Sequence, residues 1–292
     1  MMQKFSELPY TRPDVAAAVE QYEVLRKALS SAETYAQARE AFRKAEALET
    51  EPSTAESIAS IRNTMDTTDA FYDAEVAYFN ENLPALIPVT EAFTEAIVNG
   101  PFRVDFEREY GAHCIRLLEN SLLVQDARII GDLVRESELS VAYSKAAAAC
   151  KTEFRGETCN FYGLLKHMES TDRAERREAF EKWAALYADA SAELDAIYDE
   201  LVAVRAAMAE KLGFESYTAL AYRNRQRLDY TPEHVEKFRE QVRTVVTPAV
   251  ARMFEAQAKR LGVDKLRYYD ESLVFPGGNA HPIGGKDDML RA

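Results

Sequence analysis

Apolar side chains recur every three or four residues along almost the whole chain, which is the pattern of amphipathic α-helices. The clearest run begins at Asp172 and Glu175, which resemble a capping box, and ends at Gly213. A helix of about 40 residues is roughly 60 Å long, which exceeds the diameter of a small domain. We therefore expect it to form one wall of a larger body. Its predicted apolar stripe consists of Phe180, Trp183, Tyr187, Ala190, Leu194, Ile197, Leu201, Val204 and Met208.

Capping and stop residues set the bounds of the helices predicted before this run. In chain order, these are one helix opened by Pro13–Asp14, one capped by Ser31, a long one from the Ser53–Glu56 capping box to Pro84, a shorter one closed by a left-handed C-cap at Asn99-Gly100-Pro101, and two that cover residues 105–120 and 125–149. The apolar stripe of the long helix is predicted to include Ile58, Ile61, Met65, Tyr72, Val76 and Phe79.

One short segment breaks the helical pattern. Residues 151–154 and 157–160 alternate between polar and apolar types, and Arg155-Gly156 between them can form a turn. This pattern predicts a small β-hairpin. The expected fold class is therefore all-α, mainly long antiparallel helices, with one small β-hairpin near 151–160.

The last part of the chain contains one more long helix and then changes in composition. Thr231-Pro232 opens the helix, Pro248 should kink it, and Gly262 ends it. Five of the eleven glycines lie in the last 31 residues, and residues 287–290 look like a first helical turn. We divide the chain into an N-terminal helical region, 1–149, and a second region, 150–292. The apolar positions of this last helix are Val235, Phe238, Val242 and Val245.

Composition and charge exclude several classes of protein. The chain is 47% hydrophobic and carries a formal net charge of −13, so it can bury a core and would repel a nucleic acid. No apolar run reaches the roughly 18 residues of a membrane span, and the N-terminus lacks a signal-peptide pattern. The three cysteines are never spaced as pairs, which favours reduced thiols in a cytoplasmic protein.

The sequence offers no catalytic or metal-binding motif. None of the four histidines has a histidine four residues later, as a zinc-peptidase helix requires, or a glutamate three residues before it. Cys114 follows His113, but adjacent helical residues do not face each other. The glycine pairs 277–278 and 284–285 lack phosphate-loop spacing. We therefore expect no catalytic, cofactor-binding or metal residue, and a structural or surface role for His113, His167, His234 and His281.

Two arginine clusters and one aromatic stripe are weaker candidates. Either arginine cluster could bind a carboxylate, but internal salt bridges are favoured because acidic residues are abundant. The stripe Phe180–Trp183–Tyr187 favours core packing over ligand stacking, and Trp183 is expected to be largely buried. The clusters are Arg173, Arg176 and Arg177, and Arg223, Arg225 and Arg227.

Two stretches resemble a known family. They are Asp172-Arg173-x-x-Arg176-Arg177-x-Ala179-Phe180-x-x-Trp183, and Arg205-x-x-Met208-Ala209-x-x-Leu212-Gly213-Phe214-x-x-Tyr217 followed by Arg223-x-Arg225 and Asp229-Tyr230. With the hairpin at 154–157, they resemble the oligoendopeptidase F family of zinc metallopeptidases, relatives of thimet oligopeptidase. The resemblance implies a two-lobed helical body around a peptide channel, in which these helices form one wall. It also implies a zinc held by an HExxH helix and a later glutamate, with the HExxH glutamate as the base.

The sequence departs from that family in one respect. No HExxH occurs in residues 1–292, so no catalytic or zinc-binding residue can be carried over. We infer the N-terminal, channel-forming half of an oligoendopeptidase that hydrolyses short peptides, with zinc only in the complete enzyme. Its expected partners are oligopeptides and either a separate catalytic half or another copy of itself. The alternative is a non-enzymatic helical scaffold or interaction protein, and an HExxH encoded downstream would decide between the two.

Overall fold

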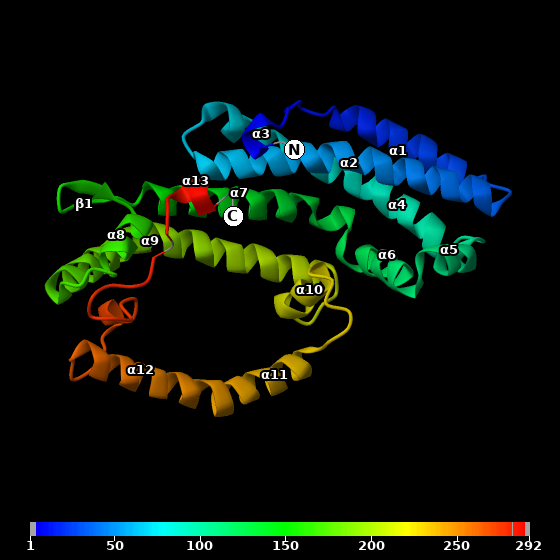
Figure 1. Cartoon of the computed structure of the whole chain (residues 1–292). Helices are drawn as coiled ribbons and strands as arrows, with labels where there is room; N and C mark the ends of the chain where they lie inside the picture. The colour runs from blue at the N-terminus through cyan, green and yellow to red at the C-terminus, as the bar shows by residue number, and fades with distance from the viewer. Residues whose placement is uncertain (1–3, 282, 290–292) are drawn as a thin grey trace. The chain divides into compact units, whose positions relative to one another are not determined.

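The computed structural model describes residues 4–281 and 283–289, which are mostly helical and include one two-stranded antiparallel hairpin. This confirms the predicted fold class. The elements are α1 Val15–Ser30, α2 Tyr35–Met65, α3 Ala70–Asn82, α4 Ile87–Val98, α5 Arg103–Tyr110, α6 Ala112–Val124, α7 Ile130–Ala149, β1 Thr152–Phe154, β2 Glu157–Cys159, α8 Phe161–His167, α9 Arg173–Lys211, α10 Tyr217–Asn224, α11 Pro232–Gln241, α12 Thr247–Leu261 and α13 Lys286–Met289 (Figure 1).

The chain forms two compact units, and each takes up two stretches of sequence. Unit 1 contains the residues up to Tyr143 together with Ile197–Asp229, and unit 2 contains Ser144–Ala196 together with the residues from Tyr230 onward. Helix α9 therefore contributes residues to both units. The predicted division into residues 1–149 and 150–292 concerns regions of the sequence rather than compact units, and it stays a prediction.

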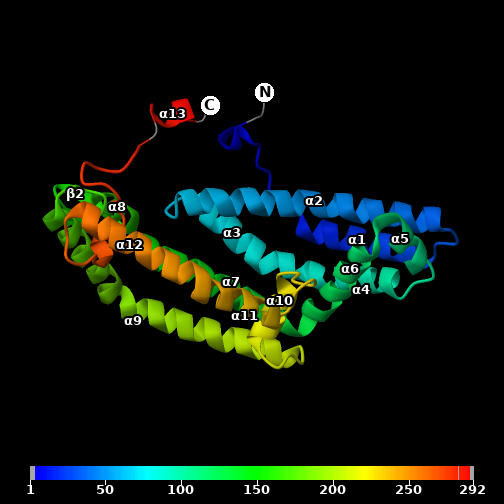
Figure 2. The same ribbon diagram turned by 60° about the horizontal axis from the view of Figure 1, so that its bottom comes forward.

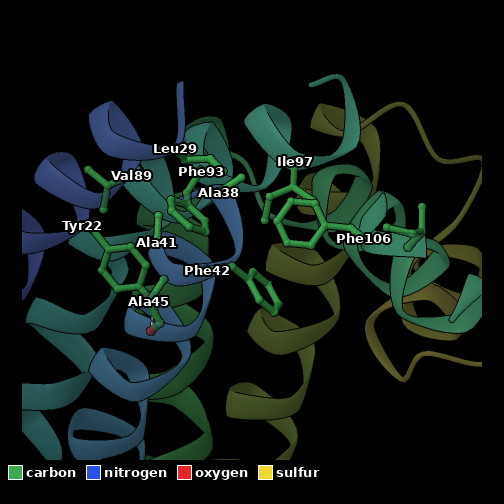
Figure 3. Close-up of a cluster of buried hydrophobic side chains, with 11 residues drawn as sticks. Tyr22, Leu29, Ala38, Ala41, Phe42, Ala45, Val89, Phe93, Ile97 and Phe106 are labelled. Atoms are coloured by element: carbon green, nitrogen blue, oxygen red, sulfur yellow. Dashed lines mark hydrogen bonds between the residues drawn. The ribbon is translucent and has the colours of Figure 1, made fainter. Parts of the chain in front are cut away.

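The core of unit 1 lies where α1, α2 and α4 pack against one another (Figure 3). Three buried alanines of α2 follow helical spacing, and their small side chains allow the neighbouring helices to approach closely. Larger side chains fill the remaining space, and the ring of Tyr22 meets that of Phe93 edge to face. The hydroxyl of Tyr22 donates to the carbonyl of Ala45 over 3.3 Å, so the one polar atom of that ring is satisfied. The alanines are Ala38, Ala41 and Ala45.

The predicted bounds of α2 are wrong at both ends. Thr34 rather than Ser31 caps the helix, in a capping box with Gln37. The helix then continues past the buried Pro52, so Ser53 lies in its interior and its hydroxyl donates to the carbonyl of Thr50. The free energy gained by burying α2 against its neighbours outweighs the cost of the backbone hydrogen bond that proline cannot make.

The long helix predicted from Ser53 to Pro84 is interrupted after Met65. Residues 66–69 leave the helix, and the side chain of Asp69 accepts hydrogen bonds from the backbone N–H groups of Phe71 and Tyr72, which starts α3. The break changes which face is buried, so Ile61 and Met65 of the predicted stripe are 46% and 75% exposed. The periodicity alone could not locate this break.

The predicted left-handed cap after α4 is also wrong, although the helix ends where expected. Asn99 has right-handed helical angles, and Gly100 is not among the residues with positive φ. Gly100 is instead needed for space, because a Cβ there would stand 2.0 Å from the carbonyl oxygen of Ala96. Farther along, the stretch predicted as one helix at residues 105–120 is split at Gly111 into α5 and α6.

Unit 2 contains the predicted hairpin, α8 and the first half of α9, which pack together (Figures 1 and 2). Arg155 and Gly156 both have positive φ, 54° and 84°, as a tight hairpin turn requires. Thr152 pairs with Cys159 and Phe154 with Glu157. The buried side chains are Phe154, Cys159, Leu164, Met168, Ala179 and Leu186.

Helix α9 has 39 residues and confirms the predicted long helix. Its buried row falls close to the predicted stripe but is rotated from it near the start. Ala179 and Leu186 are buried, whereas Trp183 is only partly buried and Tyr187 is 41% exposed. The expectation that Trp183 is largely buried is therefore wrong, because α8 and the hairpin cover the neighbouring face of the helix.

Helices α11 and α12 form one helical run with a wide turn between them. Residues Val242–Val246 adopt π-helical hydrogen bonding, in which the N–H of Thr247 bonds to the carbonyl of Val242, just before Pro248. Figure 1 shows the bend in this run. Proline lacks an N–H and crowds the preceding turn, so the distortion falls before it, as predicted. Gly262, with φ of 69°, ends α12.

Two further findings concern single segments. The turn predicted at 287–290 corresponds to α13, Lys286–Met289, and Leu290 lies outside the described residues. No helix in the described part of the chain combines the length and the apolar character that crossing a membrane would require.

Candidate functional site

The four histidines lie in different segments, His113 in unit 1 and the other three in unit 2. His113 is exposed at the start of α6, His281 is exposed after α12, and His234 lies in the first turn of α11, where its Nδ1 accepts a hydrogen bond from the backbone N–H of Thr231 over 3.1 Å. His167 ends α8 and is partly buried. Their positions do not place two histidines on one helical face.

The Cys114 thiol has none of the features of an activated nucleophile. It is partly buried while the neighbouring His113 is exposed, and burial raises the pKa of the thiol. A raised pKa lowers the fraction of thiolate, which is the reactive form. All three cysteines are free thiols.

His167 belongs to a polar cluster at the start of α9. Its Nδ1 lies 2.7 Å from Oε1 of Glu175, and Oε2 of the same carboxylate accepts a hydrogen bond from the hydroxyl of Ser170 over 2.9 Å. The hydrogen bond from His167, and then that from Ser170, lower the pKa of Glu175. Glu175 therefore does not take part in the predicted capping box, and Asp172 alone accepts from the backbone N–H of Ala174.

His167 also lies near two other potential metal ligands, which no motif in the sequence predicts. One ring nitrogen of His167, the Sγ of Cys159 and a carboxylate oxygen of Glu157 all lie within 4.8 Å of one another. Across residues 4–281 and 283–289, this is the one group of three or more such side chains. The signal was present as Glu157-x-Cys159 in a predicted strand, with His167 at the end of the next helix. Spacing within one helix and spacing between paired cysteines do not reveal a set of ligands that joins a strand to a helix end.

The first arginine cluster forms ion pairs, as expected. The guanidinium groups of Arg173 and Arg176 each lie 2.8 Å from an oxygen of Asp270, whose side chain is fully buried. Arg177 pairs with Glu181 at the surface. Burial alone would raise the pKa of Asp270, but the hydrogen bonds from Arg173, Arg176 and the backbone N–H of Arg267, with the charge of Arg173, together outweigh it and hold the pKa below its ordinary value.

The second arginine cluster lies at the end of α10 and in the residues that follow it. Arg223, in the last turn of α10, and Arg225, directly after the helix, are exposed. The guanidinium of Arg227 lies over the ring of Tyr222, 5.0 Å from its centroid. Carboxylate binding at these positions stays a prediction.

The aromatic stripe of α9 packs with other aromatic rings of unit 2 rather than standing alone. Phe161 of α8 lies over Tyr187 with ring centroids 4.1 Å apart, and Trp183 meets Tyr187 edge to face at 4.8 Å. Phe180 stacks on Tyr268 at 6.1 Å. The rings pack on one another as expected, but Tyr187 and Tyr268 are exposed, so this part of the stripe lies at the edge of the core and not inside it.

Comparison with known proteins decides the family. Residues 5–124 match the Peptidase M3 N-terminal domain, and residues 166–274 match Peptidase family M3. The chain belongs to peptidase family M3. A search of curated protein sequences gives no match.

Solved structures of M3 relatives share the fold of this chain. An X-ray structure designated oligoendopeptidase F has 36% identity and a TM-score of 0.95 over 99% of this chain. PZ peptidase A with an inhibitor has 35% identity and a TM-score of 0.95, also over 99% of this chain. A protein from Bacillus anthracis, also designated oligoendopeptidase F, has 32% identity and a TM-score of 0.93 over 98% of this chain. This chain spans about half the length of each relative, namely 51%, 51% and 53%.

The described residues of this M3 chain do not fit the zinc site that the resemblance implies. That site needs two histidines one helical turn apart with a glutamate between them, whereas the one group of three potential ligands among the described residues contains a single histidine, His167. The cluster of Glu157, Cys159 and His167 has a different composition, on a hairpin and a short helix. We therefore derive no catalytic step through zinc from this chain.

A second feature of this M3 chain is an apolar face that other described side chains leave open. It runs along α11, the π turn and α12, and we call it the α11–α12 face. A group of this size, recurring at three- and four-residue spacing, is unusual on a surface without a partner. Its members, with their exposed fractions, are Phe238 64%, Val245 68%, Val246 48%, Val250 37%, Met253 67% and Phe254 41%.

Proposed function

We propose that this chain forms the N-terminal, channel-forming portion of a zinc-dependent oligoendopeptidase that hydrolyses short peptides. The observation that carries the proposal is the shared fold with an oligoendopeptidase F at 36% identity over 99% of this chain but half of the relative. No HExxH occurs in residues 1–292. The zinc ligands and the catalytic base would then come from polypeptide outside these residues.

The α11–α12 face supports this proposal. Its exposed apolar side chains on consecutive turns resemble one half of a buried interface more than an ordinary surface. We propose that polypeptide carrying the catalytic residues covers this face in the complete enzyme. The three free thiols also support a reducing compartment, and we propose a cytoplasmic location.

A fusion protein tests the proposed function. The part of the Bacillus anthracis relative that the match leaves uncovered would be joined after Ala292, and cleavage of a quenched-fluorescence oligopeptide would be measured. We expect the fusion to cleave the peptide and a chelator to abolish cleavage, while residues 1–292 alone do not cleave it. The matched control is the appended part alone.

The experiment also addresses the second candidate, a non-enzymatic helical scaffold. A folded fusion that fails to cleave any oligopeptide would favour the scaffold, because the long helices and the open α11–α12 face suit protein binding equally well. Chelator-resistant cleavage would contradict the zinc dependence.

A further inference from the structure

We propose that Glu157, Cys159 and His167 form a zinc-binding site in unit 2, separate from any catalytic zinc of the complete enzyme. Their three ligand atoms lie within 4.8 Å of one another. The proposal departs from the expectation that His167 has only a structural role and that the chain binds no metal. It does not depend on the proposed function.

The hairpin places two of the ligands on one face. Glu157 and Cys159 are two residues apart on β2, so their side chains point to the same side of the strand. The register places Phe154 opposite Glu157, and the ring of Phe154 contacts the imidazole of His167 edge to face, with centroids 4.8 Å apart. The face that carries both ligands is thus the one that reaches His167.

Helix α8 brings the third ligand to this face. Asn160 directly follows β2, and its side chain caps the helix by accepting from the backbone N–H of Gly163 over 2.9 Å. Gly163 allows a close approach, because a Cβ at that position would stand 3.2 Å from the Cβ and 3.4 Å from the Sγ of Cys159. His167 is the last residue of the helix.

The carboxylate of Glu175 can only accept a hydrogen bond, so it favours the tautomer of His167 that carries the proton on Nδ1. Glu175 accepts the proton of Nδ1, which leaves the lone pair of Nε2 for a metal ion. Ser170 in turn donates to the other oxygen of Glu175. A carboxylate behind a histidine is the usual arrangement around bound zinc, where it orients the ring and increases its basicity.

The chemistry of the three ligands favours zinc over harder cations. A thiolate and an imidazole suit Zn²⁺, whereas Mg²⁺ and Ca²⁺ prefer oxygen ligands alone. Tetrahedral zinc places its ligand atoms roughly 3.3–3.6 Å apart, which these three side chains, already within 4.8 Å of one another, can reach by small rotations. Binding releases one proton from the Cys159 thiol to water, and the two negative ligands balance the ion's charge. Water can take the fourth position, because Glu157 is exposed.

Cobalt titration of the whole chain tests this site, because Co²⁺ replaces Zn²⁺ and absorbs strongly when bound by a thiolate. We expect one equivalent of Co²⁺ to produce a sulfur-to-cobalt charge-transfer band, and Zn²⁺ to remove it. Cys159→Ser should abolish the band, and His167→Gln should weaken binding at least tenfold. Glu157→Gln, a change of an exposed side chain that leaves the fold intact, should weaken it about tenfold. Glu175→Gln should weaken it by about tenfold or more through the orientation of His167.

The matched controls are Cys114→Ser and His113→Gln, which alter a neighbouring cysteine and histidine in unit 1. Both should bind Co²⁺ within twofold of the unaltered chain. Three results would each overturn the proposal. They are no charge-transfer band in the unaltered chain, a band that persists in Cys159→Ser, and an affinity that neither Glu157→Gln nor His167→Gln changes.

Discussion

Two buried carboxylates, Glu75 and Asp270, are each neutralised by arginine. The carboxylate of Glu75 accepts hydrogen bonds from Arg12 and Tyr10, and the hydrogen bond from Arg12 lowers its pKa the most. Asp270 binds two arginines of α9, and Gln257 donates to three backbone carbonyls beside it. A buried charge is costly unless it is paired. Removing one partner at either site should therefore strongly destabilise the protein.

Replacing Asp270 should destabilise unit 2 in a pH-dependent way. Asp270→Asn should cost about 3 kcal/mol of unfolding free energy at neutral pH, because it leaves Arg176 buried without a counter-charge. The pKa of Asp270 is lowered in the folded state, so its contribution is present above the unfolded pKa of about 3.9 and is lost as the pH falls through the lower folded value. The difference between the two proteins should therefore shrink below about pH 4.

Fluorescence of Trp183, the one tryptophan in the chain, reports urea unfolding of unit 2 in this experiment. Arg177→Gln is the control. Both side chains of the Arg177–Glu181 ion pair are exposed, so the pair should contribute less than about 0.5 kcal/mol to the free energy of unfolding. A difference between Asp270→Asn and the unaltered chain that persists unchanged at pH 3 would contradict the assignment.

Trp183 itself shows how burial changes a prediction made from sequence. Truncation of a fully buried tryptophan to alanine lowers the free energy of unfolding by about 3–5 kcal/mol, and the apolar stripe of α9 predicts a loss of that size for Trp183. Because Trp183 is only partly buried, we expect Trp183→Ala to cost about 2 kcal/mol, measured by circular dichroism during urea unfolding. A loss of 4 kcal/mol or more would mean that the ring is more deeply packed than the structure shows.

At the scale of elements, sequence predicted those whose signals are local. The hairpin turn at Arg155-Gly156, the length of α9 and the end of α12 at Gly262 all depend on a few neighbouring residues. Sequence failed where packing between helices decides the outcome. The continuation of α2 past Pro52 depends on such contacts. The cap at Thr34 was within reach of the sequence, because Thr34 and Gln37 form a local capping box. The cluster of Glu157, Cys159 and His167 was missed because it joins a strand to a helix end.

Paired cap substitutions test the corrected bounds of α2 and α3. Asp69→Ala should destabilise unit 1 by about 1 kcal/mol, because its side chain accepts from two backbone N–H groups at the start of α3. Ser53→Ala should change stability by less than about 0.5 kcal/mol, because Ser53 lies exposed inside α2. Urea unfolding followed by circular dichroism measures both. A larger loss of stability from Ser53→Ala than from Asp69→Ala would contradict these bounds and support a helix start at the predicted Ser53–Glu56 capping box.

At the scale of the whole molecule, the α11–α12 face is an apolar surface that the other described residues of the chain do not cover. An isolated chain with this exposed apolar surface should self-associate at high concentration. Replacing Phe238 and Met253 by serine should reduce self-association in sedimentation velocity, whereas replacing the exposed Met65 of α2 should not. A monomer at all concentrations would contradict an interface on this face.

The most direct test of the account is complementation between separate polypeptides. The chain would be mixed with the separately purified part of the Bacillus anthracis relative that the match leaves uncovered, and cleavage of a quenched-fluorescence oligopeptide would be followed. We predict no cleavage by this chain alone, chelator-sensitive cleavage by the mixture, and at least a tenfold loss of cleavage with the Phe238 and Met253 double variant. Cleavage by residues 1–292 alone, or binding of the two parts that never yields cleavage, would contradict the view that this M3 chain is the non-catalytic portion of an oligoendopeptidase.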